Sequence, residues 1–397
     1  MVRLASSAAL VLLLACGART ELPVGNDDGG GGEATGGGGE GEGGSGVGGV
    51  EQVALGGGHS CVRTKRGRVF CWGRNGSGQL GVETVEGQSE VPVRVPLDGR
   101  ATLLAAGTNH TCAVLEDGRL FCWGDNEDLQ ISGSAPPDVL APFQVQALPE
   151  PIEALALGEQ HSCAIANDRL FCWGATGLGQ CGTTGDELEG PFLVDTGVSE
   201  VAAGSFHTCY TRDGGQVRCM GANDDGECGV FVPTPVVPAQ VPVGLEGRVA
   251  TEIASGRGRH TCALVESALV CWGDNSTGQL GRGFVSELEL PAGVQAAPAG
   301  TVNGFAPGTT HTCALFSDDV FCWGDNFSGQ LGIAGGSTSL PVPTGLSGIV
   351  AVGSGSVHSC AYASPTEIYC WGTNAFGQLG NGKSSPDPSL PVKVELP

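Results

Sequence analysis

Histidine and cysteine are the residues of this chain whose types and spacing could do chemistry. Each histidine stands two residues before a cysteine, in His-Ser-Cys or His-Thr-Cys, and a second cysteine follows nine or ten residues later. One histidine and two cysteines per copy could supply three ligands to a zinc ion, which usually takes four. The alternative is a disulfide, which would leave no thiolate for a metal. The histidines are His59, His110, His161, His207, His260, His311 and His358.

The spacing within each cysteine pair favours the disulfide over the metal site. If Cys163 lies opposite Cys172, a spacing of nine leaves Asn167-Asp168 as a two-residue turn, the preferred hairpin loop. A spacing of ten leaves a three-residue loop, and most of these end in glycine, where a left-handed residue is needed. The cysteines then form a non-hydrogen-bonded pair with Cα atoms about 4.5 Å apart, within disulfide range. We therefore predict no metal and seven disulfides: Cys61–Cys71, Cys112–Cys122, Cys163–Cys172, Cys209–Cys219, Cys262–Cys271, Cys313–Cys322 and Cys360–Cys370.

No catalytic constellation stands out beside these pairs. The same register places His161 opposite Gly174, and we expect each histidine to pack over that glycine and to hydrogen-bond backbone between repeats. The tryptophan of the Trp-Gly that ends six of the copies is expected to pack between repeats. Since every histidine belongs to the repeat, a Ser-His-Asp arrangement would need a structural histidine as its base. The sequence therefore predicts no catalytic residue, no cofactor and no enzymatic activity.

Two further cysteines, Cys181 and Cys228, replace the leucine of Gly-Gln-Leu-Gly in consecutive repeats. A matched replacement in neighbouring repeats predicts that they bond to each other. The alternative is that equivalent positions in adjacent repeats are too far apart, which would leave two free thiols.

The repeats themselves predict the fold. Successive histidines are 46 to 53 residues apart, and repeats of about 50 residues rich in strand signals are typical of a β-propeller. We predict an all-β, seven-bladed propeller of four-stranded blades over residues 51–397. The first unit lacks a "PVxV" strand, and Leu390 to Leu396 supply a spare copy. We therefore expect this C-terminal strand to complete the first blade and close the ring, which would leave no open sheet edge.

The repeat resembles a known family. The stretches "AAGTNHTCAVLEDGRLFCWGDN" and "WGDNSTGQLGRG" are similar to RCC1-type repeats, over all of Glu51 to Pro397. The resemblance implies a seven-bladed propeller. The family's founder is a nuclear exchange factor for a small GTPase. This chain is acidic, lacks a basic tail and begins with a segment typical of export, so we do not expect that activity. A secreted bacterial propeller of this class that inhibits β-lactamases is a closer analogy.

The N-terminus reads as an export signal. Arg3 precedes the apolar run Ala8 to Ala15, which is too short to span a membrane. The run ends in "LLAC", which resembles the lipobox of bacterial lipoproteins, cut before an acylated Cys16. We predict a signal peptide at 1–15; an ordinary signal peptide with a chance cysteine is the alternative. Residues 16–50 would carry the lipid and a Gly-rich acidic stalk spanning about 30 Å, tethering the domain to the outer membrane or cell surface.

Charge excludes one class of partner. The chain carries a net charge of −23, and residues 52–397 still hold 35 acidic against 17 basic side chains. Such a surface repels phosphate backbones, so we expect no nucleic acid to bind.

Departures from the repeat are concentrated in the second to fourth units, where loops are irregular and acidic. We predict a non-catalytic, monomeric interaction scaffold that uses these loops to bind an unidentified, basic protein. Neutral drift of surface loops is the alternative explanation of the pattern. The alternative functions are an inhibitor of a secreted or envelope enzyme, and a propeller lyase, which would need unrepeated polar groups converging on one face. The predicted contact residues are Glu127, Asp128, Asp186, Glu187, Glu189, Asp224, Asp225 and Phe231.

Overall fold

The computed structural model describes residues 48–397 apart from 147, 364–365 and 385–387. The predicted signal peptide, Cys16 and nearly all of the stalk lie outside the described residues. The strands of the first four blades are β1 (Val50–Leu55), β2 (His59–Thr64), β3 (Val69–Arg74), β4 (Gln88–Arg94), β5 (Ala101–Ala106), β6 (His110–Leu115), β7 (Leu120–Asp125), β8 (Asp138–Gln144), β9 (Ile152–Leu157), β10 (His161–Ala166), β11 (Arg169–Gly174), β12 (Leu188–Thr196), β13 (Val198–Ala203), β14 (His207–Arg212), β15 (Gln216–Gly221) and β16 (Val236–Gln240). Those of the last three are β17 (Ala250–Ser255), β18 (His260–Val265), β19 (Ala268–Asn275), β20 (Ser286–Gly293), β21 (Val302–Pro307), β22 (His311–Phe316), β23 (Asp319–Gly324), β24 (Thr338–Pro343), β25 (Ile349–Ser354), β26 (His358–Ala363), β27 (Glu367–Gly372) and β28 (Val392–Val394).

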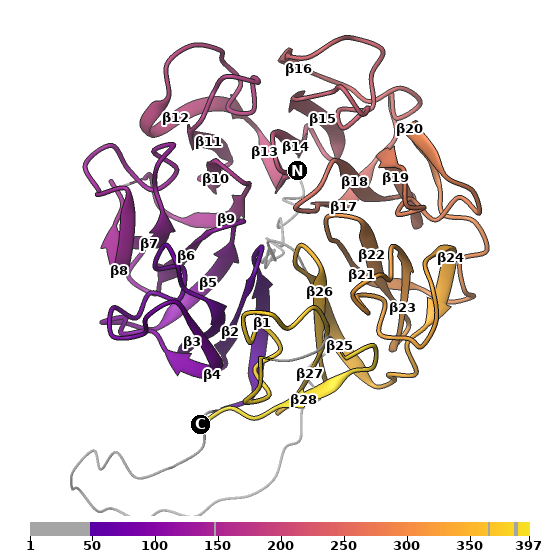
Figure 1. Ribbon diagram of the computed structural model, residues 1–397. Helices are drawn as coiled ribbons and strands as arrows, with labels where there is room; N and C mark the ends of the chain where they lie inside the picture. The colour runs from indigo at the N-terminus through magenta and orange to yellow at the C-terminus, as the bar shows by residue number, and fades with distance from the viewer. Residues whose placement is uncertain (1–47, 147, 364–365, 385–387) are drawn as a thin grey trace, which may run out of the picture.

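These strands form seven antiparallel sheets of four, each made of consecutive strands, arranged as blades around a central axis (Figure 1). The predicted seven-bladed all-β propeller is confirmed. Within the described ranges, no helix is long and apolar enough to cross a membrane.

Closure of the ring differs from the prediction. The first blade already holds β1 to β4, and the C-terminal strand β28 pairs with β27 of the seventh blade. The expectation that Leu390 to Leu396 complete the first blade is therefore wrong. The "PVxV" segment is the last strand of each unit rather than its first, so β4 supplies the copy that the first unit seemed to lack. Side chains join the two end blades instead, since the Tyr362 hydroxyl donates to the Glu51 carbonyl at 2.8 Å.

The central hairpin of each blade has the predicted register. Cys163 lies opposite Cys172, and both residues of the Asn167-Asp168 turn have positive φ, as the two-residue hairpin requires. All seven predicted disulfides are present, with Cα atoms 4.1 Å apart. Closing a loop of about ten residues stabilises the fold by roughly 2–3 kcal/mol in the chain-entropy model.

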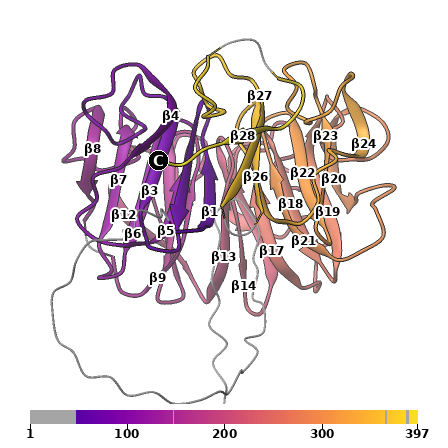
Figure 2. The same ribbon diagram turned by 90° about the horizontal axis from the view of Figure 1, so that it is seen from below.

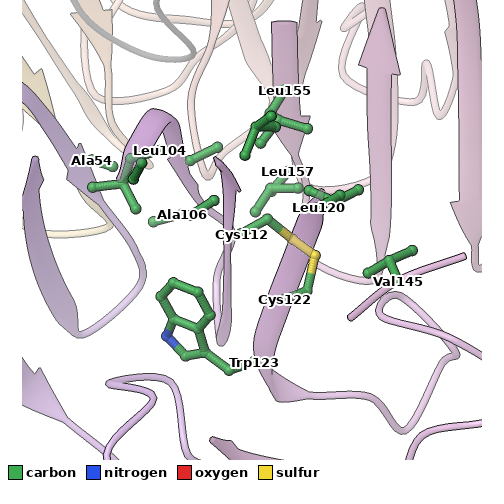
Figure 3. Close-up of a cluster of buried hydrophobic side chains, with 14 of the residues drawn as sticks. Ala54, Leu104, Ala106, Cys112, Leu120, Cys122, Trp123, Val145, Leu155 and Leu157 are labelled. Atoms are coloured by element: carbon green, nitrogen blue, oxygen red, sulfur yellow. A yellow bond between two sulfur atoms is a disulfide. The ribbon is translucent and has the colours of Figure 1, made fainter. Parts of the chain in front are cut away.

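Apolar packing continues from blade to blade. Around the second blade, the Cys112–Cys122 disulfide and Trp123 lie among side chains of the first and third blades, such as Ala54 and Leu157 (Figure 3). The Trp123 indole N–H donates to the Gln79 carbonyl of the preceding blade at 3.0 Å. The expected packing of the tryptophans between repeats is thus confirmed. Five of the six indoles donate such a bond to the preceding blade, and the Trp173 indole N–H has no hydrogen-bond partner.

The two faces of the ring follow from strand direction. Because neighbouring strands of a blade are antiparallel, the connections between its first and second and its third and fourth strands lie on one face. We call this the upper face, and it is uppermost in Figure 2. The lower face holds the hairpin turns between second and third strands and the connections between blades. The first described residues, which precede β1, also lie on the lower face.

One side chain closes the central channel. Arg257 lies between β17 and β18 of the fifth blade, and its guanidinium donates to the Leu157 carbonyl at 2.7 Å and the Leu55 carbonyl at 2.8 Å. A further bond reaches the Ala106 carbonyl, so one cation bridges to the innermost strands of three other blades. The cavity left beside it measures about 10 Å³, barely the room of one water molecule.

Glycine on both sides lets the Arg257 loop reach the channel. A Cβ atom on Gly256 would lie 2.0 Å from the Gly308 carbonyl oxygen, and one on Gly258 would lie 2.1 Å from that of Thr309. The sequence contained a sign of this longer loop that our prediction missed. The spacing of 53 residues between His207 and His260 is the longest between successive histidines.

Candidate functional site

The histidines form a closed ring of hydrogen bonds between blades. Each Nε2 atom lies 2.8–2.9 Å from the serine or threonine hydroxyl of the His-Ser/Thr-Cys motif in the next blade, and His358 of the last blade reaches Ser60 of the first. The expectation of a backbone partner is therefore wrong, although the bond does join blades. The pairs are His59–Thr111, His110–Ser162, His161–Thr208, His207–Thr261, His260–Thr312, His311–Ser359 and His358–Ser60.

The hydroxyl partners determine which ring nitrogen carries the proton. The Thr111 hydroxyl donates to the Gln79 carbonyl at 3.0 Å, so it accepts from Nε2–H of His59. The Nδ1 atom is then the bare nitrogen, and it is buried without a hydrogen-bond partner in six of the seven rings. Burial lowers the pKa of His161 to about 3, and the same cause acts on the other histidines.

Six of the seven imidazoles pack on a different glycine from the predicted one, and this glycine stands three residues before the histidine. Gly174 does lie opposite His161, but its missing Cβ makes room for backbone rather than for the ring. The imidazole packs on Gly158, where a Cβ would lie 2.3 Å from its Cε1 atom. Buried, neutral and held in this way, the histidines are structural groups and are inaccessible as bases for a dissolved substrate. No group of three or more His, Cys, Asp or Glu suited to a metal ion occurs in the described part of the chain.

Cys181 and Cys228 are both buried free thiols, so the predicted bond between them is wrong. Each occupies the fully buried position that Leu80 and Leu280 hold in other blades. Each sulfur lies 3.3 Å from a carbonyl six residues earlier in its own loop, Ala175 and Ala222 respectively. The two cysteines belong to separate core clusters, which explains why they stay apart. Burial raises the pKa of Cys181 to about 12, so this thiol is inert.

The predicted contact residues all lie on the upper face, in or beside the connections between third and fourth strands of blades two to four. Phe231 is 76% exposed, and most of the acidic residues are exposed as well. The loops of neighbouring blades touch, since the Gly133 N–H donates to the Glu189 carbonyl at 2.7 Å. Asp128 and Asp225 are half-buried, and Asp225 differs from the other acidic residues because it is paired with Arg259.

Electrostatics show that part of this set is one cluster. The pKa of Asp128 is raised, first by burial and then by the charges of Asp125 and Glu187. Glu227 stands in the fourth blade where other blades have a buried glutamine, and burial raises its pKa to about 7. Acidic groups thus crowd the upper rim of blades two to four strongly enough to perturb one another.

Exposed aromatic residues extend the upper face beyond the predicted set. Phe284 of the fifth blade, Phe327 of the sixth and Phe376 of the seventh lie in the same type of connection as Phe231. Phe327 is 95% exposed. Our prediction missed these residues because it considered only the most irregular loops, although a phenylalanine at a loop tip was a visible signal.

A depression of about 630 Å³ opens near the axis on this face. Asp225, Asp274 and Glu287 line it together with Arg259, which pairs with Asp225, and with hydroxyl groups such as that of Thr309. Its acidic groups come from the third, fourth and fifth blades, since Glu159 lines it as well, and Asp274 and Glu287 lie at the upper ends of β19 and β20. They continue the acidic rim toward the exposed Phe284.

These observations define a disulfide-clamped β-propeller whose blades are joined by histidines and whose variable loops share one face. Residues 40–335 match the RCC1-like domain family, and residues 317–362 and 367–397 match the regulator of chromosome condensation (RCC1) repeat. The chain therefore belongs to the RCC1-like domain family, and the resemblance seen in its repeats is confirmed.

Curated relatives share the repeat in different settings. The chain is 31% identical to the ultraviolet-B receptor UVR8 of Arabidopsis thaliana over 62% of this chain and 58% of the receptor. It is 30% identical to the probable E3 ubiquitin-protein ligase HERC6 of Homo sapiens over 75% of this chain and 30% of that protein. The regulator of chromosome condensation of Mus musculus is 29% identical over 71% and 74% of the two chains. The chain spans only 6% of the length of the E3 ubiquitin-protein ligase HERC2 of Homo sapiens.

Among solved structures, human WBSCR16 superposes with a TM-score of 0.74 at 24% identity, over 83% of this chain and 94% of that one. This similarity shows the fold alone.

Proposed function

We propose that this propeller is a non-catalytic, monomeric interaction scaffold, held on the cell envelope by a lipid at Cys16, whose upper face binds a basic protein. The observation that carries the proposal is the charge of the upper connections. Acidic side chains there far outnumber the basic ones, Arg282 and Lys383, in the described residues between third and fourth strands. The acidic residues are Glu83, Glu86, Glu127, Asp128, Asp186, Glu187, Asp224, Asp225, Glu227 and Asp325.

The fold supports a binding role because its buried histidines, hydroxyl groups and cysteines stabilise the blades. The ring of histidines and hydroxyls links the blades, and the disulfides clamp the hairpins. What varies between blades is the length, charge and aromatic content of the upper loops. Exposed phenylalanines beside acidic groups suit a partner that presents apolar side chains among lysine and arginine.

Neutralising the upper rim should weaken partner capture. We expect Glu127→Gln, Asp186→Asn, Glu187→Gln and Asp224→Asn together to reduce the recovery of basic proteins from envelope extracts by about tenfold, because steering and contact charges are lost. Pull-down followed by mass spectrometry measures the recovery. The matched control carries Glu150→Gln, Asp168→Asn, Asp318→Asn and Asp319→Asn, four exposed acidic residues of the lower face. Equal capture by both variants would refute the proposed face.

The lipid anchor is tested separately. We expect the chain produced in a diderm bacterium to incorporate radiolabelled fatty acid and to sediment with membranes, since a lipid attached at Cys16 partitions into the bilayer. Cys16→Ser should lose the label and release the protein to the soluble fraction. Labelling that persists in the variant, or soluble wild-type protein, would rule the anchor out.

A further inference from the structure

The lower face carries the opposite charge in one place. Five basic residues, Lys65, Arg66, Arg68, Arg94 and Arg100, gather at the lower edge of blades one and two. We call them the arginine patch. All five are exposed, in a chain whose net charge is −23. The four arginines line a depression of about 350 Å³, which the acidic residues Asp98 and Glu116 also line.

The patch is built by a tight turn. The hairpin turn of the first blade rests on the connection to the second, because the Ala101 N–H donates to the Gly67 carbonyl at 2.9 Å. A Cβ on Gly67, whose φ is +72°, would lie 2.7 Å from Cβ of Arg100, so only glycine permits this approach. The turn thus holds Arg66 and Arg68 beside Arg100.

Internal acidic groups do not neutralise the patch. Asp98 forms an ion pair at 2.9 Å with Arg119, which lies outside the patch. Glu116 lies 3.9 Å from Arg100, and both of these side chains are more than half exposed. Lys65, Arg68 and Arg94 have no ion-pair partner among the residues that the structure describes. Exposed guanidinium groups such as those of Arg68 and Arg94 are suited to phosphate, which arginine binds through paired hydrogen bonds.

The position of the patch points to the anionic ligand. The Lys65 N–H donates to the Gly49 carbonyl at 2.8 Å, and the Arg66 side chain packs against Gly48, the first described residue. The patch therefore adjoins the point where the chain continues toward Cys16. A lipid at Cys16 would bring the membrane to this side of the propeller.

We propose that the arginine patch binds the anionic phosphate headgroups of the membrane that carries the anchor, and so turns the upper face away from the bilayer. The inference rests on the proposed lipid anchor. The acidic upper face does not oppose this contact strongly, because charges are screened over about 8 Å at physiological salt. Each basic residue near an anionic bilayer strengthens binding by about fivefold, so several together orient a tethered domain.

Vesicle sedimentation tests the proposal without the lipid. The full mature chain with Cys16→Ser is mixed with vesicles of phosphatidylcholine alone or with added phosphatidylglycerol. We expect binding only to the anionic vesicles, weakened by salt, and reduced at least about tenfold by Arg68→Glu with Arg94→Glu. The matched control, Arg74→Glu with Lys383→Glu, reverses two exposed charges of the upper face and should bind as the parent does.

Four outcomes would overturn the proposal, three of them in the vesicle assay as described. These are absence of binding to anionic vesicles, equal loss in both double variants, and displacement from vesicles by millimolar inorganic phosphate at constant ionic strength, which would assign the patch to free phosphate. Binding that appears only after the stalk carboxylates are neutralised would assign the patch to the stalk, and also overturns it. Fatty-acid labelling of Cys16 is independent of all these results, so failure of the anchor and failure of the patch are distinguishable. The stalk carboxylates are Glu21, Asp27, Asp28, Glu33, Glu40 and Glu42.

Discussion

Lowering the pH from 6.5 should unfold this propeller cooperatively, with a midpoint between about pH 4 and 5.5. The cause is the histidine ring. Burial lowers the folded pKa of six histidines to about 3, and their pKa in the unfolded chain is near 6.5. The unfolded state therefore binds more protons between these values, so stability is complete above pH 6.5 and is lost as pH falls toward 3.

The expected pH effect is large because the groups act together. One such group changes the free energy of unfolding by about 1.4 kcal/mol per pH unit, so six approach about 8 kcal/mol per unit, close to the whole stability of an ordinary domain. Glu227 opposes this, since a carboxyl pKa raised to about 7 favours the folded state as pH falls from 7 toward 4.5. A single carboxyl cannot balance six imidazoles.

Urea unfolding followed by tryptophan fluorescence at several pH values measures this slope, because the tryptophans are fully buried. His161→Gln serves as the comparison. It should reduce the slope of the free energy of unfolding against pH by about the contribution of one histidine. A free energy of unfolding that stays constant between pH 6.5 and 4.5, or imidazole resonances that titrate near pH 6.5 in the folded protein, would contradict the assignment.

Replacing Arg257 by methionine should lower the free energy of unfolding by about 3–5 kcal/mol. The substitution leaves the carbonyls of Leu55, Ala106 and Leu157 without their charged donor, and each buried, unpaired carbonyl costs about 1–3 kcal/mol. Water entering the vacated channel offsets part of that loss. We expect the disulfides still to form, because they lie within single blades.

Arg259→Met is the matched control, since Arg259 lies in the same loop, is about half exposed and pairs with Asp225 at the surface. We expect a change of about 1 kcal/mol or less there. Chemical denaturation of both variants at neutral pH gives the comparison. If Arg257→Met proved no more harmful than Arg259→Met, the guanidinium would have no bracing role in the channel.

The sequence by itself determined what depends on local spacing. Seven copies of one motif specified seven blades, and cysteine spacings of nine and ten specified the turns, the register and the disulfides. These features could be predicted because each hairpin contains both partners of its own contacts. Local spacing did not specify that Asp186 and Asp224 lie on the upper face, but the irregularity of their loops made them candidate partner-contact residues.

Only the tertiary structure decided what depends on neighbouring blades. The sequence shows that Cys181 and Cys228 hold equivalent positions in adjacent blades, but it does not give the distance between those positions. We therefore predicted a bond between them that is absent from the structure. The hydroxyl partner of each histidine comes from the next blade, about 50 residues away for six of them and 298 residues away for His358. Arg257 reaches three other blades through the channel. The placement of the acidic loops on the upper face and of the arginine patch on the lower face likewise arises only when alternating strand directions sort the loops. Local sequence specifies a blade, but the closed ring specifies which surfaces the blades bury and which they present.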